Sequence, residues 1–145
     1  MARSIKDTYT GLSGQNAVKA ELLHRLCNVA VPEVDVGEDV LAFLEGSDVI
    51  SRIQVKTANA RRLKAEGSYS AQFTVPLEQL RRDDVPPLHY VFAVRLDGTW
   101  CDFLVISRPD LEDLQSGEGV GTVNEGALKL TLSFRAEEVR CGGVS

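Results

Sequence analysis

The sequence predicts an α/β fold in which a long N-terminal helix precedes a mixed, mostly antiparallel sheet flanked by short helices. Apolar residues recur at helical spacing near the N-terminus. Most of the remaining chain consists of short β-rich runs separated by glycine, proline and aspartate. The chain has 145 residues and is 43% hydrophobic, which suits one domain with its own core. We therefore expect a single domain over residues 1–145.

The first expected element is a helix over residues 12–30. Val18 and Leu22 recur within it at helical spacing, and Ser13 is its expected N-cap. A loop should follow this helix, because Pro32 interrupts regular structure.

Two hairpins are expected in the β-rich part of the chain. The first, over residues 39–57, has a Gly-Ser pair at 46–47 that can form a two-residue turn. The second, over residues 89–107, has an Asp-Gly pair at 97–98. The other expected elements are strands over residues 68–75 and 127–134 and short helices over residues 77–84 and 108–115.

Composition excludes some classes of protein. No apolar run approaches the roughly 18 residues that a membrane span needs, and the N-terminus lacks the apolar core of a signal peptide. The three cysteines are widely scattered, which argues against a disulfide framework and for a reducing compartment. We therefore expect a cytoplasmic protein without membrane association.

The net charge of −5 argues against a nucleic-acid partner, but the charge is unevenly distributed. One basic segment, residues 52–64, contains no acidic residue and could form a localised footprint for phosphates. The alternative is a solvated loop with chance clustering. The basic residues of this segment are Arg52, Lys56, Arg61, Arg62 and Lys64.

The register of the first hairpin places polar residues together. If Gly46 and Ser47 form a two-residue turn, Asp39 lies opposite Gln54. Lys56 is two residues beyond Gln54 and therefore points to the same face of the strand. Carboxylate and amide oxygens are hard ligands that suit Mg²⁺, and a lysine beside them can stabilise charge on a phosphate. The trio could therefore hydrolyse a phosphodiester, although a longer turn would shift the register.

This pattern resembles the PD-(D/E)XK nuclease superfamily, in which an acid begins one strand and (D/E/Q)-x-K follows on the next. The matching segment is VDVGEDVLAFLEGSDVISRIQVKT, with Asp39 followed by Gln54 and Lys56. The upstream segment SGQNAVKAELLHRL resembles the first helix of that fold. The likeness covers residues 11–58 and extends to small members such as group I intron-encoded homing endonucleases. It implies a restriction endonuclease-like core.

The resemblance implies a role for each matching residue. Asp39 matches the metal-binding acid, and Gln54 matches the position of the second acid. The backbone carbonyl of Val55 would be a further metal ligand, and Lys56 matches the catalytic lysine.

Two residues of the first helix could support such a site. Gln15 occupies the position that often carries glutamate in this superfamily, and it shares a helical stripe with Val18 and Leu22. Glu21 lies on the flank of that stripe and ranks second.

The resemblance therefore implies a Mg²⁺-dependent DNA endonuclease in which Mn²⁺ can substitute. Arg52, Thr57, Asn59, Arg61, Arg62 and Lys64 are the expected DNA contacts. Cutting both strands of a duplex needs two sites, so we expect a homodimer or a homotetramer.

Two other readings stay open. Gln15 and Gln54 are amides at positions that are often acidic in the superfamily, and each missing carboxylate weakens the attraction for a divalent ion. The chain could therefore be a catalytically degenerate module that binds DNA or a protein partner without cleavage. The acidic net charge also fits a soluble domain with no role on nucleic acids.

Overall fold

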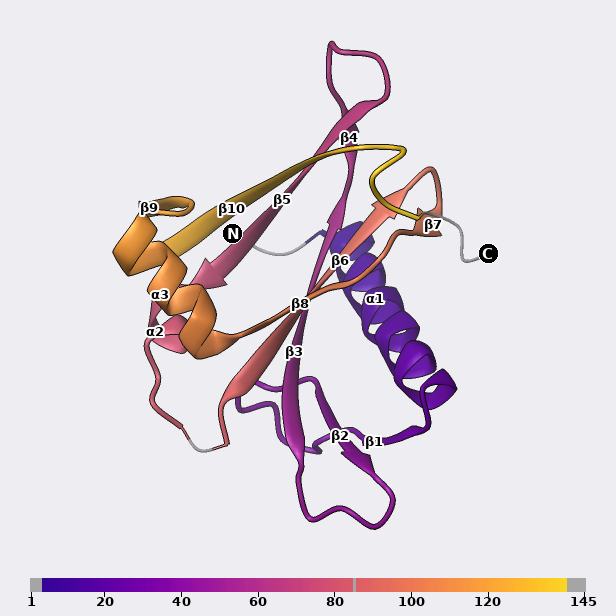
Figure 1. Cartoon of the computed structure of the whole chain (residues 1–145), viewed down its shortest axis with the longest axis vertical. Coiled ribbons are helices and arrows are strands. Elements are labelled where there is room, and N and C mark those ends of the chain that lie inside the picture. The colour runs from indigo at the N-terminus through magenta and orange to yellow at the C-terminus, as the bar shows by residue number, and fades with distance from the viewer. Residues whose placement is uncertain (1–3, 85, 141–145) are drawn as a thin grey trace.

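The computed structural model describes residues 4–84 and 86–140 (Figure 1). Its helices are α1 (Ile5–His24), α2 (Leu77–Leu80) and α3 (Arg108–Glu118). Its strands are β1 (Cys27–Ala30), β2 (Val40–Leu44), β3 (Ser51–Asn59), β4 (Arg61–Arg62), β5 (Ser68–Pro76), β6 (Leu88–Leu96), β7 (Thr99–Trp100), β8 (Leu104–Ser107), β9 (Thr122–Asn124) and β10 (Ala127–Arg135).

The strands form two sheets rather than the one sheet that the pattern suggested. The first sheet has the order β1-β2-β3-β6-β7, with β8 also paired to β6, and the second has the order β4-β5-β10-β9. Among the described strands, β3 and β6 are the parallel pair, and the other pairs are antiparallel. The predicted class, a mixed and mostly antiparallel α/β fold, is therefore confirmed.

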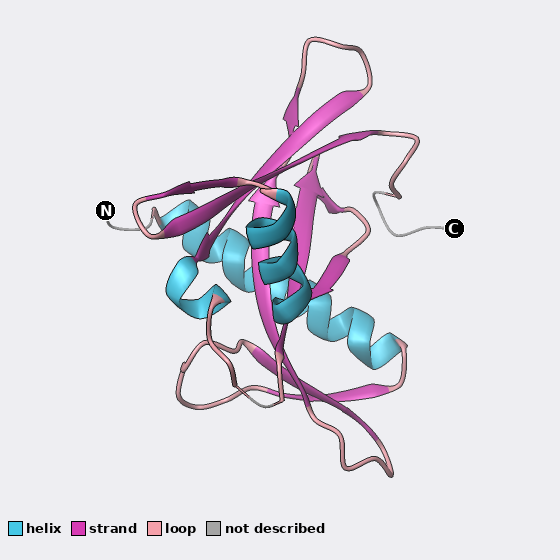
Figure 2. Ribbon diagram, turned by 60° about the vertical axis from the view of Figure 1, so that its left-hand side comes forward, coloured by secondary structure: helices cyan, strands magenta, loops and turns pink. Residues whose placement is uncertain are grey.

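Each face of the first sheet contributes to a buried apolar cluster. On one face, Val18 of α1 packs against a cluster that includes Ile53 and Val55 of β3. On the other face, Tyr90 and Phe92 of β6 pack against the second sheet and against α2 and α3. Figure 2 shows α1 and α3 on opposite sides of the central strands. The second sheet, by contrast, buries only its inner face in this core.

Helix α1 begins earlier than expected. Ser4, not Ser13, is the N-cap, and its side chain accepts a hydrogen bond from the Asp7 amide at 3.1 Å. The Ser13 hydroxyl instead donates to the Thr10 carbonyl at 2.9 Å inside the helix. Gly14 stays helical because tertiary packing needs it: a Cβ at this position would overlap the methyl group of Thr57.

The predicted helix is also too long at its C-terminal end. Helix α1 ends at His24, and residues 27–30 form strand β1, which pairs with β2. Leu26 stands between the two elements with φ 64°, the left-handed conformation that usually ends a helix. Leu26 is also 82% exposed and does not continue the apolar stripe of α1.

The first hairpin keeps the predicted register with a different turn. Val40 pairs with Ile53, and Ala42 pairs with Ser51, as a two-residue turn would require. The tight turn, however, closes from the Ser47 amide to the Leu44 carbonyl at 3.1 Å, so Gly46 is its second central residue. Three further residues then lead into β3, and the loop stays even in length, so the register is preserved.

The cysteine expectation was wrong in one respect. Cys101 is disulfide-bonded, whereas Cys27 is a free thiol. Cytoplasmic localisation therefore stays a prediction that this disulfide does not favour. No helix within residues 4–84 and 86–140 is long and apolar enough to cross a membrane.

Candidate active site

A polar groove of about 850 Å³ lies where α1, β3 and the second sheet meet. The N-terminal half of α1 lines one side, and residues 54–59 of β3 line the floor. Strands β4, β5 and β10 line the other side, and the loop before β2 closes one end. The groove brings together eight of the predicted site residues: Gln15, Asp39, Gln54, Val55, Lys56, Thr57, Asn59 and Arg61.

Asp39 is anchored to β3 as the register predicted. Its backbone amide donates to the Ile53 carbonyl at 2.8 Å, which extends the pairing of β2 with β3 by one residue. Its carboxylate Oδ2 accepts from the Gln54 side-chain amide at 2.6 Å and from the Val55 backbone amide at 2.8 Å. Asp39 is thus half-buried and fixed at the point where β2 begins.

The Val55 carbonyl lies on the same strand edge as the Asp39 carboxylate. Backbone groups of alternate strand residues point to the same edge, and the Ile53 carbonyl points to Asp39. The Val55 amide also points to Asp39, and its carbonyl shares that edge beyond the start of β2. The Val55 side chain, in contrast, is buried against α1.

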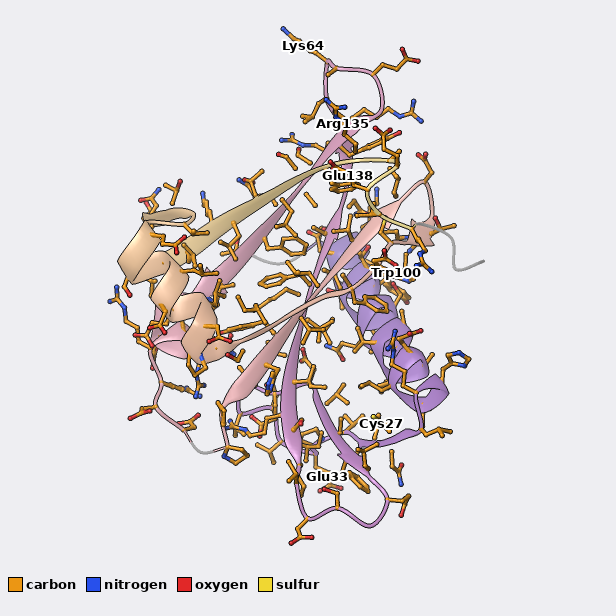
Figure 3. All side chains as sticks on the ribbon, viewed as in Figure 1. Cys27, Glu33, Lys64, Trp100, Arg135 and Glu138 are labelled. Atoms are coloured by element: carbon orange, nitrogen blue, oxygen red, sulfur yellow. The ribbon has the colours of Figure 1, made fainter. Side chains whose placement is uncertain are left out.

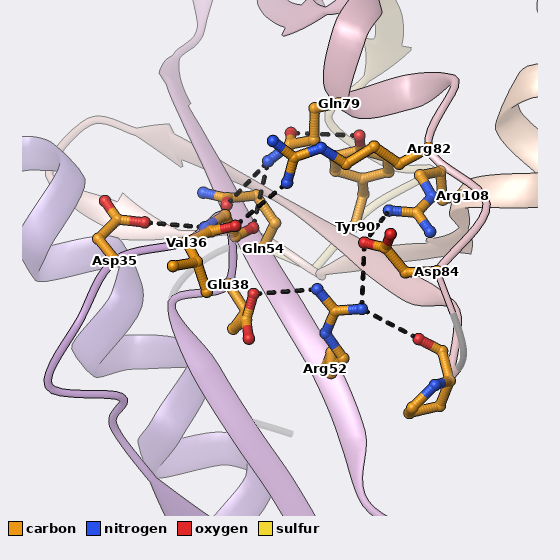
Figure 4. Close-up of polar contacts among 12 residues, drawn as sticks. Asp35, Val36, Glu38, Arg52, Gln54, Gln79, Arg82, Asp84, Tyr90 and Arg108 are labelled. Carbon is orange, nitrogen blue, oxygen red and sulfur yellow. Dashed lines mark hydrogen bonds and ion pairs between the residues drawn. The ribbon is translucent and has the colours of Figure 1, made fainter.

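Gln79, which sequence reasoning missed, holds Gln54 from the opposite side (Figure 4). Its side-chain amide donates to Gln54 Oε1 at 3.3 Å and to the Gly37 carbonyl at 3.1 Å. Its oxygen accepts from the Tyr90 hydroxyl at 3.2 Å. Burial raises the pKa of Tyr90 to about 12, so the phenol stays protonated and can donate at neutral pH. The sequence does not single out Gln79, which is one of two polar residues between Leu77 and Leu80 of α2.

The two helix candidates separate clearly. Gln15 is half-buried and lines the groove. Glu21 does not line it and instead accepts from the Arg25 guanidinium at 2.9 Å one helical turn away. The ranking of Gln15 above Glu21 thus agrees with their positions, although the role of neither residue is tested.

Arg52 faces a different environment from the one expected of a DNA contact. Its guanidinium pairs with Glu38 at 3.1 Å and with Asp84 at 3.4 Å, and it donates to the Pro86 carbonyl at 3.2 Å (Figure 4). The hydrogen bond that Arg52 donates to the Glu38 carboxylate raises the pKa of Arg52 above its ordinary value. The charge of Arg52 is therefore balanced by Glu38 and Asp84, and Arg52 does not line the groove.

The remaining basic residues are divided by strand alternation. Arg61 pairs with Ser70 and lines the groove, whereas Arg62 pairs with Tyr69 and points to the opposite face. Arg62 forms an exposed ion pair with Asp97 at 3.5 Å. Lys64 lies at the tip of the loop between β4 and β5 (Figure 3) and does not line the groove.

The oxygen donors beside Asp39 fit a Mg²⁺ ion that keeps several waters. Magnesium typically takes one or two carboxylates and completes its shell with water and substrate phosphate. Asp39 and the Val55 carbonyl lie at one edge, and Asp35 also lines the groove. Gln54 presents its amide nitrogen to Asp39, so its oxygen would have to turn before it could bind an ion. Within residues 4–84 and 86–140, no three His, Cys, Asp or Glu residues cluster as a metal site.

Comparison with known proteins bears on the fold. No protein-family model and no curated protein matches the sequence. The chain is similar to the solved structure of a bacterial homing endonuclease, I-Ssp6803I, with a TM-score of 0.50 and 16% identity. The match covers 98% of this chain and 84% of the other. At this identity the likeness shows the fold alone, so the chain has a nuclease-like fold, and its assignment to the PD-(D/E)XK superfamily stays a prediction.

Proposed function

We propose that this protein is a metal-dependent endonuclease that hydrolyses DNA, with a PD-(D/E)XK site of the Gln-x-Lys type. One observation carries the proposal. The predicted hairpin register places Asp39 in hydrogen-bonding contact with Gln54 and Val55, and Lys56 lines the same groove. The similarity to a bacterial homing endonuclease supports DNA as the substrate.

Each residue has a distinct part in this proposal. Asp39, the Val55 carbonyl and, after rotation of its amide, Gln54 would hold Mg²⁺, with Mn²⁺ able to replace it. The bound ion would supply charge neutralisation at the scissile phosphate and a more acidic water. Lys56 stabilises the negative charge that develops on the phosphate. Gln79 and Tyr90 act as positioning residues, because they fix the side chain of Gln54.

The experiment is a plasmid cleavage assay in Mg²⁺ and in Mn²⁺. Lys56→Ala should cut about 10²–10³-fold more slowly than the wild type, the usual loss when one charge-stabilising group is removed. Lys19→Ala, which removes a lysine of α1 outside the groove, is the matched control and should cut at the wild-type rate. Equal rates for the wild type and Lys56→Ala would reject the proposal.

A non-cleaving DNA-binding module is the second candidate. The observation that favours it is the side chain of Gln54, whose amide nitrogen and not its oxygen faces Asp39. This reading predicts DNA binding that is unaffected by Mg²⁺ or Mn²⁺ and no cleavage in either metal. Cleavage that disappears in Lys56→Ala would exclude it.

We further propose that two or more copies assemble, because cutting a duplex on both strands needs two sites. The segment from residue 26 to residue 50 supports this. It contains the sheet-edge strand β1 and exposes Leu26, Val34 and Val49 at 82%, 68% and 70%. Leu26 keeps its left-handed backbone without burying its side chain, which is unfavourable for a lone subunit. Light scattering should give a dimer or larger for the wild type and a smaller species for Leu26→Asn; a wild-type monomer would contradict assembly.

A further inference from the structure

The outer face of the second sheet is a continuous polar surface. Along β5, Ala71, Phe73 and Val75 are buried, while Gln72 and Thr74 between them are exposed. Along β10 the same alternation exposes every second residue. Register places these exposed residues in rows, with Gln72 beside Thr131 and Thr74 beside Lys129. The exposed residues of this face, called here the outer face, are Arg61, Gln72, Thr74, Pro76, Thr122, Asn124, Lys129, Thr131, Ser133 and Arg135, and the half-buried Ser68, Ser70 and Ala127 lie among them.

The outer face differs from the rest of this acidic protein in its charge. The outer face carries three basic residues, Arg61, Lys129 and Arg135, and its strands contain no acidic residue, although the whole chain carries a net charge of −5. Arg135, at the end of β10, has a weak exposed ion pair with Glu137 at 3.9 Å. Arg61 and Lys129 lie on the two sides of the β5 row. This sign of charge complements a phosphate backbone.

The outer face runs directly into the groove. Ser70, Gln72 and Thr74 of β5 and Thr131 of β10 line both surfaces. A ligand that spans the outer face therefore reaches the edge of β3, where Asp39 and Lys56 lie. This continuity is what links the face to the proposed cleavage site.

The chemistry of the side chains on the outer face indicates which class of ligand this face can bind. Among the described residues, no aromatic and no large apolar side chain is exposed on the outer face itself. Tyr69 and Phe134 stack with each other on the inner face, and the exposed Val123 of β9 pairs with the inward-facing Leu128. Single-stranded nucleic acids are held by stacking on aromatic rings, and protein partners by apolar anchors. Hydroxyl, amide and cationic groups are instead the groups that contact base edges and phosphates of a duplex.

The dimensions of the ribbon formed by β5 and β10 fit the major groove of B-DNA. Each strand has nine residues, which at about 3.4 Å per residue gives a length of about 30 Å. One turn of B-DNA is about 34 Å long, and its major groove admits a two-stranded β-ribbon. The deep, narrow major groove of duplex RNA does not.

We propose that the outer face reads the base edges of duplex DNA from the major groove, with Gln72 as its central reader. This inference rests on the proposed function, since it assigns a recognition surface to the same DNA. Glutamine can form two hydrogen bonds with adenine, and Thr131 and Thr74 beside it can contact bases of either kind. Arg61 lies where the outer face meets the groove, and it contacts a phosphate of the DNA strand that enters the groove towards Lys56.

The experiment is selection of bound sequences from a randomised duplex DNA library, performed by the full-length protein in metal-free buffer so that no cleavage is needed. The wild type should enrich a consensus. In Gln72→Ala, the preference for the consensus base should fall at least about five-fold at one or two adjacent positions. The base preferences at the other positions should be unchanged. Gln115→Ala, an amide removed from α3, is the matched control and should enrich the wild-type consensus. Thr131→Val, which preserves side-chain shape, should relax a neighbouring position, and thermal melting confirms that each variant is folded.

Several outcomes would overturn the inference. They are binding without any consensus, an unchanged consensus in both variants, and displacement of the DNA by an RNA duplex of the same sequence as readily as by DNA. These results are separable from failure of the proposed function, which is decided by the plasmid assay. A protein that cuts plasmid but selects no consensus keeps its nuclease assignment and loses this reading surface. A protein that selects a consensus but never cuts loses the nuclease assignment alone.

Discussion

Arg52 and Lys56 project from the same face of β3, four residues apart, yet they lie in opposite environments. Arg52 is held between Glu38 and Asp84 and lies outside the groove. Lys56 lines the groove beside the half-buried carboxylate of Asp39. The N-terminal end of β3 is thus covered by acidic residues of two loops, Glu38 and Asp84. Its C-terminal part, residues 54–59, lines the groove between α1 and the second sheet. Arg52 therefore stabilises the fold through acidic residues of neighbouring loops, whereas Lys56 is placed to act on a ligand of the groove.

The same contrast divides the basic segment that the sequence shows as one cluster. Arg52 is neutralised within the fold, and Lys56 and Arg61 line the groove. Arg62 and Lys64 are exposed and do not line the groove. Only the middle group of this segment is placed to contact a ligand of the groove, which sharpens the predicted footprint to two residues.

The largest effect expected from this comparison is on stability, at Arg52. Arg52→Ala should lower the free energy of unfolding by about 2–3 kcal/mol, because Glu38 loses its hydrogen-bonded partner in a half-buried site, while Asp84 keeps its ion pair with Arg108 at 3.6 Å. Arg62→Ala, whose ion pair with Asp97 is exposed, should cost less than about 1 kcal/mol. Urea unfolding of both variants measures the difference, and similar losses would show that Arg52 is not a structural cation.

A second effect concerns the buried layer that holds Gln54 through Gln79. The pKa of Tyr90 is raised from 10.0 to about 12, so the folded protein retains the phenolic proton more tightly than the unfolded chain. The stability from this group is complete below pH 10 and decreases as the pH rises from 10 towards 12, by about 2 kcal/mol. Tyr90→Phe should lack this alkaline decrease. If unfolding of both proteins follows the same pH dependence, Tyr90 does not carry it.

The smallest expected effect distinguishes Arg61 from Arg62. In filter-binding titrations at several salt concentrations, Arg61→Ala should reduce the slope of log K against log salt by about one unit, because one phosphate contact is lost. Arg62→Ala is the matched control, since its side chain points away from the groove, and its slope should be that of the wild type. Equal slopes for the two variants would remove Arg61 from the DNA path.

Local patterns were enough to predict the centre of the candidate site. The register of β2 with β3 follows from alternation and from an even loop length, and it brings Asp39 to Gln54 although the expected two-residue turn at Gly46 and Ser47 does not form. The hairpin with Asp97 and Gly98 is equally local, and both residues have the positive φ that such a turn requires.

Tertiary packing decided what the sequence could not show. Gly14 and Ser13 weaken helix propensity and suggested a helix start, but close contact between Gly14 and Thr57 keeps them inside α1. The ion pair of Arg52 with Asp84 and the hydrogen bond from Gln79 to Gln54 join residues 32 and 25 positions apart. The ion pair of Arg52 with Glu38 joins a strand to a loop. No local period encodes such contacts. The division of the strands into two sheets, and hence the outer face, is likewise a property of long-range pairing.

Asp39 and the Val55 carbonyl are proposed to hold a divalent ion beside Lys56. Crystals soaked in Mn²⁺ and measured near the manganese absorption edge test this proposal directly. We expect an anomalous peak between the Asp39 carboxylate and the Val55 carbonyl in the wild type and no such peak in Asp39→Ala. A groove without such a peak at saturating Mn²⁺, or a peak that persists in Asp39→Ala, would contradict it.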